Sequence, residues 1–250
     1  MLKSKLNCLI QKFLLRSIHT KMEQAPIIHG KRQSRARDTA DVKLSKTLSR
    51  ILRHSATKEN LPIGSDGYIA VSVLLKHQQF QGKKFEDIVR VVENNSKSRF
   101  ELEYRGDTTD ESQSAVKTDP QGWWIKANQG HSIEVENLAL EQIVDSDKCP
   151  VAVHGTYISS WNKAIKDQGL SKMARNHIHL ATGLADESGV ISGMRGSASV
   201  YIYIDVAKAM ADGIKFYKST NGVVLTEGQG GILQPKYFKQ VVSKDGNILR

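Results

Sequence analysis

The first half of the chain shows helical and then strand-like spacing of apolar residues. In LSKTLSRILRH (44–54) they fall at i, i+4, i+7 and i+8, which predicts an amphipathic helix ending near Arg53 and His54. A short helix is predicted over 71–77, and the apolar positions of 85–92 predict a third. Alternation then predicts strands at 99–104 and 123–126, around a polar loop at 106–122. Three helices followed by a hairpin is the order of a winged helix, a helix-turn-helix variant that commonly contacts nucleic acid, and we assign it to residues 41–135.

After about residue 150 the pattern changes to many short strands. Strands are predicted at 151–153, 200–205 and 223–226, the last one after the turn STNG (219–222). A helix fits 159–168 and ends at Gly169, a residue type favoured just beyond a helix C-terminus. Residues 150–245 are therefore expected to form a mostly β module, and the fold class of the whole chain is α+β.

The stretch MARNHIHLA (173–181) carries a polar face that is unusual for a strand. Alternation places His177 and His179 on one face beside Arg175, with the apolar residues of the stretch on the other. Three interpretations fit this spacing: a catalytic or binding site, a zinc site completed by His154, or histidines that bond to backbone carbonyls near a core. Arg175 would repel a cation, and no carboxylate is obviously placed nearby. Taken singly, Arg53 and His54 at a helix end and Arg99 at a strand edge also have structural explanations.

The charge of the chain indicates a polyanionic partner. Lys and Arg number 36 against 26 Asp and Glu, a net charge of +10, which favours nucleic acid over membrane. No apolar run approaches the ~20 residues that span a bilayer. Cys8 and Cys149 lie far apart and fit no zinc spacing, so a disulfide framework is not indicated and a reducing compartment is expected.

Residues 1–40 stand apart as a basic leader. MLKSKLNCLIQKFLLRSIHTKM (1–22) has five Lys or Arg residues, no acid and helically spaced apolar residues, which is typical of a mitochondrial transit peptide. A disordered basic leader and initiation at Met22 are the alternatives. The basic cluster at 31–37 fits a nuclear signal or a solvated linker. We therefore expect a nuclear or cytoplasmic protein, with mitochondrial targeting as the alternative that the leader suggests.

Seven segments follow the same order as in the RNA 2′-phosphotransferases, and on them the chain resembles that family. They are LSKTLSRILRH (44–54), the RF of KSRFEL (97–102), KANQGHSI (126–133), HGT (154–156), GLSKMARNHIHLA (169–181), GVISGMR (189–195) and STNGVVLT (219–226). The resemblance covers residues 41–245. It implies an enzyme that removes the splice-junction 2′-phosphate from ligated tRNA using NAD, with a winged-helix lobe followed by a lobe of the ADP-ribosyltransferase type.

The motif match implies a catalytic set of Arg53, His54, Arg99 and Arg175. In the family's reaction the RNA 2′-phosphate attacks C1″ of NAD and nicotinamide leaves. The ribose O2″ then attacks phosphorus, giving 2′-OH RNA and ADP-ribose 1″,2″-cyclic phosphate. Arginine matches phosphate oxygens bidentately and stays protonated, so the arginines are expected to clamp the phosphate, with His54 as a donor or acid–base. Lys126 stands where some relatives carry Arg, which keeps the charge and loses the bidentate geometry.

The resemblance also implies an NAD pocket, and no metal is expected. Its residues would be His154, Gly155, Thr156, Gly169, His177, His179, Ser219 and Asn221. The expected partners are NAD and 2′-phosphorylated tRNA, with no membrane, and the protein is expected to be a monomer. Two rival functions are an ADP-ribosyltransferase that caps terminal phosphates of nucleic acid and a catalytically silent RNA-binding module. The complete arginine set argues against the silent module.

Overall fold

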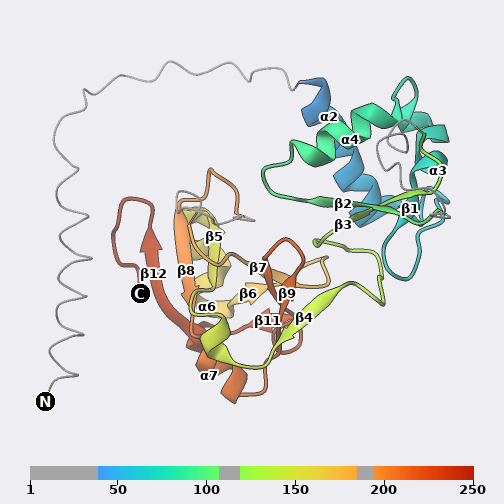
Figure 1. The fold of residues 1–250 in the computed structure, drawn as a ribbon. Coiled ribbons are helices and arrows are strands. Elements are labelled where there is room, and N and C mark those ends of the chain that lie inside the picture. Colours follow the sequence, from blue (N-terminus) through green and yellow to red (C-terminus); the bar gives the residue numbers. More distant parts are fainter. Residues whose placement is uncertain (1–38, 107–118, 185–193) are drawn as a thin grey trace, which may run out of the picture. The chain divides into compact units, whose positions relative to one another are not determined.

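The computed structural model of the chain describes residues 39–106, 119–184 and 194–250 (Figure 1). The basic leader at 1–22, the cluster at 31–37, most of the loop 106–122 and the start of GVISGMR lie outside the described residues, so the localisation stays a prediction. Within the described parts, no helix is long and apolar enough to cross a membrane.

The helices and the hairpin predicted for the first half are present, with one additional short strand. The helical segments are α2 (Ala40–Arg50), the π-helical turn η1 (Ile51–Ser55), α3 (Val71–Lys76), the 3-10 turn η2 (Gln78–Phe80) and α4 (Phe85–Glu93). The strands are β1 (Ile69–Ala70), β2 (Phe100–Tyr104) and β3 (Trp123–Ala127), paired antiparallel in the order β1-β3-β2. Thr39 caps α2, because its side chain accepts a hydrogen bond from the Val42 backbone N–H. The winged-helix assignment itself stays a prediction.

These elements enclose a hydrophobic cluster that we call the first core. Leu44 and Leu48 of α2, Phe85 and Ile88 of α4, and Ile125 of β3 are all buried in it. The helical spacing of α2 and α4 places these side chains on one face of each helix, which explains why this part of the sequence could be interpreted from its pattern.

The second half is built from short strands with few helices, as predicted. The strands are β4 (Leu140–Ile143), β5 (Val153–Thr156), β6 (Leu170–Ser171), β7 (Ile178–Leu180), β8 (Val200–Ile204), β9 (Phe216–Ser219), β10 (Val224–Thr226), β11 (Ile232–Leu233) and β12 (Phe238–Ser243). The helical segments are η4 (Ser146–Lys148), α5 (Ile158–Ser160), η5 (Trp161–Ile165), α6 (Lys166–Gln168), α7 (Val206–Ala211) and η6 (Pro235–Tyr237). The strands form three sheets, with the orders β4-β9-β10-β7, β12-β8-β5 and β11-β6. The α+β class is thereby confirmed.

Several predicted boundaries differ from the structure. The strand expected at 151–153 begins at Val153 and continues through the HGT segment. The strand expected to carry Arg175 and His177 begins only at Ile178, because residues 173–177 form a turn and bends. The helix expected at 159–168 runs from 158 to 168 but contains the π-helical turn η5. Alternation does hold inside β7, where Ile178 and Leu180 are buried.

In the described part of the second half, an isolated bridge brings the sheet β4-β9-β10-β7 and the sheet β12-β8-β5 edge to edge. Val153 and Ala181 exchange both backbone hydrogen bonds, at 2.9 and 2.8 Å, which joins β5 to the end of β7. The apolar faces of both sheets bury a second cluster, the second core, which includes Val200, Ile202 and Phe216. The bridge sets the HGT strand directly beside the HIH strand.

We expect Leu48→Ala to lower the free energy of unfolding by about 2–5 kcal/mol, because Leu48 is fully buried in the first core. Urea denaturation followed by circular dichroism would measure it. Val42→Ala is the control on the same helix, since that side chain is 41% exposed, and should change the free energy by less than about 0.5 kcal/mol. Equal losses for the two variants would contradict this account of the first core.

Candidate active site

Arg53 and His54 lie on a widened helical turn. After α2 the backbone switches to the π-helical η1, where the Ala56 N–H donates to the Ile51 carbonyl at 3.0 Å. Continued α-helical spacing would bury Ser55, but the π-helical turn gives the buried position to Ala56. Arg53 and His54 remain only half-buried on this turn, at the edge of the first core. Such π-helical turns often occur at functional sites.

The loop Gly130–His131–Ser132–Ile133 wraps around this turn. The backbone N–H groups of Ser132 and Ile133 both donate to the Arg53 carbonyl, at 2.9 and 3.3 Å. The Ser132 hydroxyl lies 2.9 Å from Nδ1 of His54. Gly130 has φ +90°, and a Cβ there would lie 3.5 Å from three side-chain atoms of Arg53. The loop therefore fixes the backbone of Arg53, the orientation of the His54 ring, and one wall around the Arg53 guanidinium.

The segment that carries Arg175 is attached to the same loop. The Asn176 N–H donates to the His131 carbonyl at 3.0 Å, and the Asn176 side-chain amide donates to the Ile133 carbonyl, also at 3.0 Å. Arg175 is thus anchored next to a loop whose other side holds Arg53. Arg53 and Arg175 are 122 positions apart in the sequence, and the same four residues, 130–133, connect their segments.

Arg53 has no anionic partner among the described residues. Its Nε and Nη2 atoms are buried and make no hydrogen bond, and the part of the chain that the structure describes has no ion pair to Arg53, Arg99 or Arg175. Burial, followed by the positive charges of Arg99 and Arg175, lowers the pKa of Arg53 to about 10. It therefore stays protonated at neutral pH, with two like charges nearby. Buried charges are normally paired, so this arrangement indicates a site for an anion.

Arg99 is held in place by a separate set of contacts. It follows Ser98, whose φ of 41° is unusual for a residue other than glycine. Its guanidinium donates to the Asn95 side-chain oxygen at 3.1 Å, and its carbonyl accepts from the Asn128 N–H at 2.9 Å. Burial lowers the pKa of Arg99. The four residues predicted to be catalytic thus come from three separate segments and influence one another electrostatically.

The histidines at the site are held in the neutral form. Burial and the nearby arginines Arg175 and Arg53 lower the pKa of His179 to about 3, and burial, then Arg53, lowers that of His131 to about 4. Burial and then Arg175 also lower the pKa of His54. The ring Nδ1 of His154 lies 2.9 Å from the His179 carbonyl, across the bridge between the two sheets. This bond to a backbone carbonyl matches the structural interpretation of the histidines. By contrast, Nε2 of His179 and both ring nitrogens of His131 are buried and have no hydrogen-bond partner among the described residues.

A cavity of about 760 Å³ adjoins these groups. His54, His154, Thr156, Arg175, His177 and His179 line its polar side. Ile165, Leu170, Met173 and Ile232 line an apolar side. A smaller cavity of about 310 Å³ is lined by Gly155 and shares His154, Arg175, His179 and Arg195 with the larger one. The lining of the larger cavity also includes the cations Lys163, Lys172 and Arg195, so a cavity of this size with one apolar side suits an anionic small ligand such as a nucleotide.

Gly155 and Gly169 are required for close packing. A Cβ on Gly155 would lie 2.6 Å from the Met194 sulfur. Gly169 has φ +91°, and a Cβ there would lie 2.4 Å from the Leu233 carbonyl oxygen. Gly169 lines the larger cavity, but the close approach to Leu233 already accounts for a glycine at that position.

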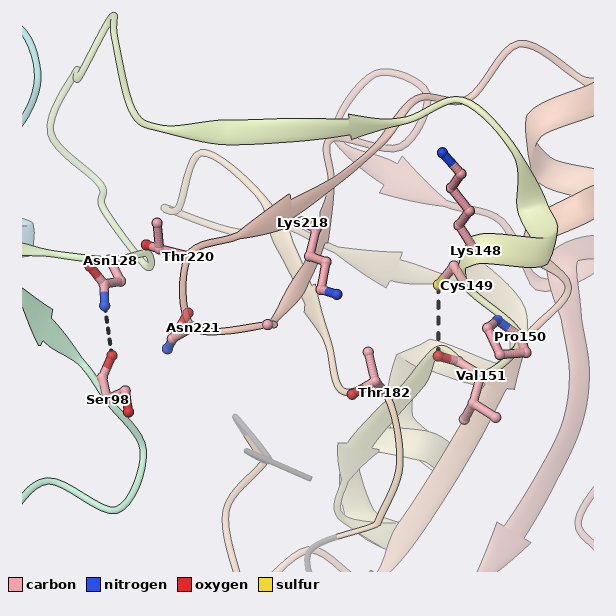
Figure 2. Close-up of a pocket in the computed structure, with 11 residues that line it drawn as sticks. Ser98, Asn128, Lys148, Cys149, Pro150, Val151, Thr182, Lys218, Thr220 and Asn221 are labelled. Atoms are coloured by element: carbon pink, nitrogen blue, oxygen red, sulfur yellow. Dashed lines mark hydrogen bonds between the residues drawn. The ribbon is translucent and has the colours of Figure 1, made fainter. Parts of the chain in front are cut away.

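Ser219 and Asn221 lie apart from the other predicted NAD residues. The Ser219 hydroxyl donates to the Asn221 side-chain oxygen at 2.8 Å, and the Asn221 amide donates to the Lys97 carbonyl at 3.1 Å. Asn221 lines a separate cavity of about 570 Å³ with Ser98 and Lys218, shown in Figure 2. Both side chains therefore stabilise the turn before β10 and its link to residue 97, and their role toward NAD stays a prediction.

Four site residues were not singled out from the sequence: His131, Ser132, Asn176 and Arg195. All four lie inside quoted motifs, KANQGHSI, MARNHIHLA and GVISGMR, but nothing in one sequence shows that these residues converge on one site. Lys126 of the first motif is buried, 3.3 Å from Glu101 and 4.6 Å from the Tyr68 ring centroid, which gives it a structural partner. Among the described residues, no group of three or more His, Cys, Asp or Glu is placed to hold a metal ion.

Clustered arginines around neutral histidines, beside a nucleotide-sized cavity, form a candidate active site whose charge suits a phosphorylated ligand. Residues 39–228 match the family described as RNA 2′-phosphotransferase, Tpt1 / KptA family. The chain therefore belongs to the RNA 2′-phosphotransferase family and is an enzyme of that kind. The resemblance drawn from seven motifs is confirmed.

Named relatives agree with this membership. The chain is 48% identical to tRNA 2′-phosphotransferase 1 of Danio rerio over 212 residues, which cover 84% of this chain and 88% of the relative. It is 43% identical to tRNA 2′-phosphotransferase 1 of Homo sapiens over 223 residues, covering 88% and 83%. A Schizosaccharomyces pombe relative is 46% identical over 208 residues, and this chain spans only about half of its length, 53%.

We expect Arg175→Gln to raise the pKa of His54, because a neighbouring positive charge disfavours the imidazolium. Proton NMR titration of the His54 ring, assigned with His54→Asn, would measure it. Arg250→Gln removes the same charge at the C-terminus and should leave the His54 titration unchanged. An unaltered pKa in Arg175→Gln would show that Arg175 does not act on His54.

We expect acid to destabilise the protein partly through His131. Its folded-state pKa of about 4 lies below the ordinary 6.5, so the unfolded chain binds the proton first as the pH falls. The resulting stability is present above pH 6.5 and is lost between pH 6.5 and 4, at up to about 1.4 kcal/mol per pH unit. His131→Gln should reduce the slope of unfolding free energy against pH by about that amount, as measured by urea denaturation. Identical slopes would contradict a buried neutral His131.

Proposed function

We propose that this enzyme removes the splice-junction 2′-phosphate from ligated tRNA and transfers it to NAD. The products would be 2′-OH tRNA, nicotinamide and ADP-ribose 1″,2″-cyclic phosphate. The observation that carries this proposal is the Arg53 guanidinium, with two buried nitrogens that have no partner in the described ranges and the charges of Arg99 and Arg175 nearby. The human and zebrafish relatives are named tRNA 2′-phosphotransferases, which supports tRNA as the substrate.

A dianionic phosphate would relieve the repulsion among the three arginines. Guanidinium groups donate paired hydrogen bonds to phosphate oxygens and cannot lose the proton at neutral pH. Groups fixed before the substrate arrives stabilise charge that develops around phosphorus without having to reorganise. The loop at 130–133 supplies this rigidity for Arg53, and Asn176 extends it to the residue next to Arg175.

His54 would act through the ring nitrogen that faces away from Ser132. Since Nδ1 is bonded to the Ser132 hydroxyl, Nε2 is the nitrogen available to the substrate. When the hydroxyl donates to Nδ1, Nε2 carries the proton and can donate to a phosphate oxygen. When Nδ1–H donates to the hydroxyl, Nε2 can accept a proton. The lowered pKa keeps the ring neutral, so both roles are open to it at neutral pH.

The larger cavity is proposed as the NAD site. His154, Thr156, His177 and His179 would contact the ribose and phosphate groups, and the apolar side would contact a base. In the first step a 2′-phosphate oxygen forms a bond to C1″ and the bond from C1″ to nicotinamide breaks. In the second step O2″ attacks phosphorus, the bond from phosphorus to the RNA O2′ breaks, and the proton of O2″–H is balanced by protonation of O2′.

We expect the protein to release label from an RNA that carries one internal ³²P-labelled 2′-phosphate, only when NAD is present and also in excess EDTA. The label should appear in a small cyclic phosphate that chromatography separates from RNA. Arg53→Lys keeps the charge but not the bidentate geometry, and should lower kcat by about tenfold or more.

Two other results would overturn the proposal. Label that accumulates on an RNA–ADP-ribose adduct would indicate an ADP-ribosyltransferase that stops after the first step. Label that stays on the RNA with NAD present would leave an RNA-binding protein, and the arginine cluster would need another ligand.

A further inference from the structure

The ammonium group of Lys97 joins the segment of Arg99 to the segment of Arg195. Lys97 lies two residues before Arg99, and its Nζ donates to the Met194 carbonyl at 2.5 Å. Met194 lies directly before Arg195, which lines both cavities of the candidate site. We propose that Lys97 is a positioning residue that holds Arg195 at these cavities, where Arg195 binds an anionic group of the dinucleotide. The inference rests on the proposed function for the identity of that dinucleotide, and on the contacts of Lys97 for the rest.

The backbone of Lys97 is held on both sides. Its N–H donates to the Asn95 side-chain oxygen at 3.1 Å, and the same oxygen accepts from the Arg99 guanidinium, also at 3.1 Å. Its carbonyl accepts from the side-chain amide of Asn221, which is labelled in Figure 2, at 3.1 Å. Because both backbone groups are bonded, the contact from Nζ attaches Met194 to a segment that is already fixed in place.

The partner of this lysine is a backbone carbonyl and not a carboxylate. Lys97 is half-buried, and none of the ion pairs in the described ranges includes it. Burial, followed by the charge of Arg99, lowers the pKa of Lys97. A cation that is partly removed from water beside a like charge is normally paired with a carboxylate. The bond to Met194 leaves the positive charge of the site in place, so it serves to position that residue.

Met194 also packs against the HGT strand. A Cβ on Gly155 of that strand would lie 2.6 Å from the Met194 sulfur, so the two residues are in close contact. A few residues later the chain is bonded to the end of the same strand, because the Ser199 N–H donates to the Thr156 carbonyl at 2.8 Å. Arg195 therefore lies in a short segment that is anchored at Ser199 by β5 and at Met194 by the lysine.

Arg195 is the residue of this segment that reaches the candidate site. It lines both cavities together with Arg175 and His179, and its charge, after burial, contributes to the lowered pKa of Arg175. An arginine in this place can donate paired hydrogen bonds to phosphate oxygens, such as those of a dinucleotide diphosphate. Because Arg195 is exposed, a shift of its backbone would move the guanidinium away from the cavities.

The first test varies NAD at a saturating concentration of 2′-phosphorylated RNA. Lys97→Met removes the ammonium group at similar length, and should raise KM for NAD about threefold to tenfold while kcat and KM for RNA change less than about twofold. Lys97→Arg keeps a donor for the Met194 carbonyl and should restore most of the NAD affinity. Lys43→Met is the matched control, since Lys43 is an exposed lysine of α2 that lines neither cavity.

A double-mutant cycle tests whether Lys97 acts through Arg195. Arg195→Gln alone should raise KM for NAD by about tenfold, and adding Lys97→Met should then raise it further by less than about twofold, because the residue that the lysine positions is already altered. Effects of the two substitutions that simply multiply would overturn the positioning role. A rise in KM for RNA in place of NAD would show that Lys97 contacts the RNA, and would overturn it as well.

Hydrogen–deuterium exchange separates this inference from the proposed function, because it needs no substrate. The Ala198 N–H donates to the Arg195 carbonyl at 3.0 Å, so its exchange reports opening of this segment. In Lys97→Met the amides of 195–199 should exchange faster than in Lys43→Met, with those of β12 unchanged. Equal exchange in the two variants would overturn the inference. A wild-type protein that releases no label from RNA with NAD, but shows this difference in exchange, would overturn the proposed reaction and leave the positioning of Arg195 standing.

Discussion

The structure depends on holding like charges together without an anion of its own. Arg53 has buried nitrogens with no partner among the described residues, and Arg99 and Arg175 add charges that disfavour its protonated form. The free energy of that repulsion must be met by the rest of the fold, through the buried first core and through backbone hydrogen bonds that do not involve the guanidinium groups. A ligand that brings two negative charges would remove this cost, which supports the proposed phosphate site.

The loop at 130–133 is the element that holds the charged side chains of the site close together. Its backbone holds the Arg53 carbonyl, its serine holds His54, and its carbonyls hold Asn176. These contacts join the loop to two segments, η1 and the residues before β7, so a displacement of one predicted catalytic group would disturb the others. Neutral histidines fit the same arrangement, because additional protonated rings would increase the repulsion that the site already contains.

Sequence patterns could predict the elements because their causes are local. The helical spacing around Leu48 and the alternation in β7 reflect which face is buried, and both are found in the structure. The π-helical turn at Ile51–Ser55 could not be predicted, since it exchanges Ser55 for Ala56 in the core through packing. The arginines and histidines were found through motif resemblance, whereas the roles of Ser132 and Asn176 depend on bonds between segments far apart in the chain. Ser219 and Asn221 show the converse. They belong to a quoted motif, but the bond between them stabilises the turn that contains them.

The candidate site draws its charged residues from elements of both cores, and burial gives a physical reason for this arrangement. A transfer between an RNA and a dinucleotide needs both to reach one phosphorus atom from different directions. One core alone would present its arginines to solvent, where water would screen them and weaken their hold on phosphate. Arg53, His54 and Arg99 lie on the first core, and Arg175 lies next to the strand that carries His179, so elements of both cores supply charge to the same candidate site. The π-helical turn η1 and the loop at 130–133 are the local features that hold these residues in place.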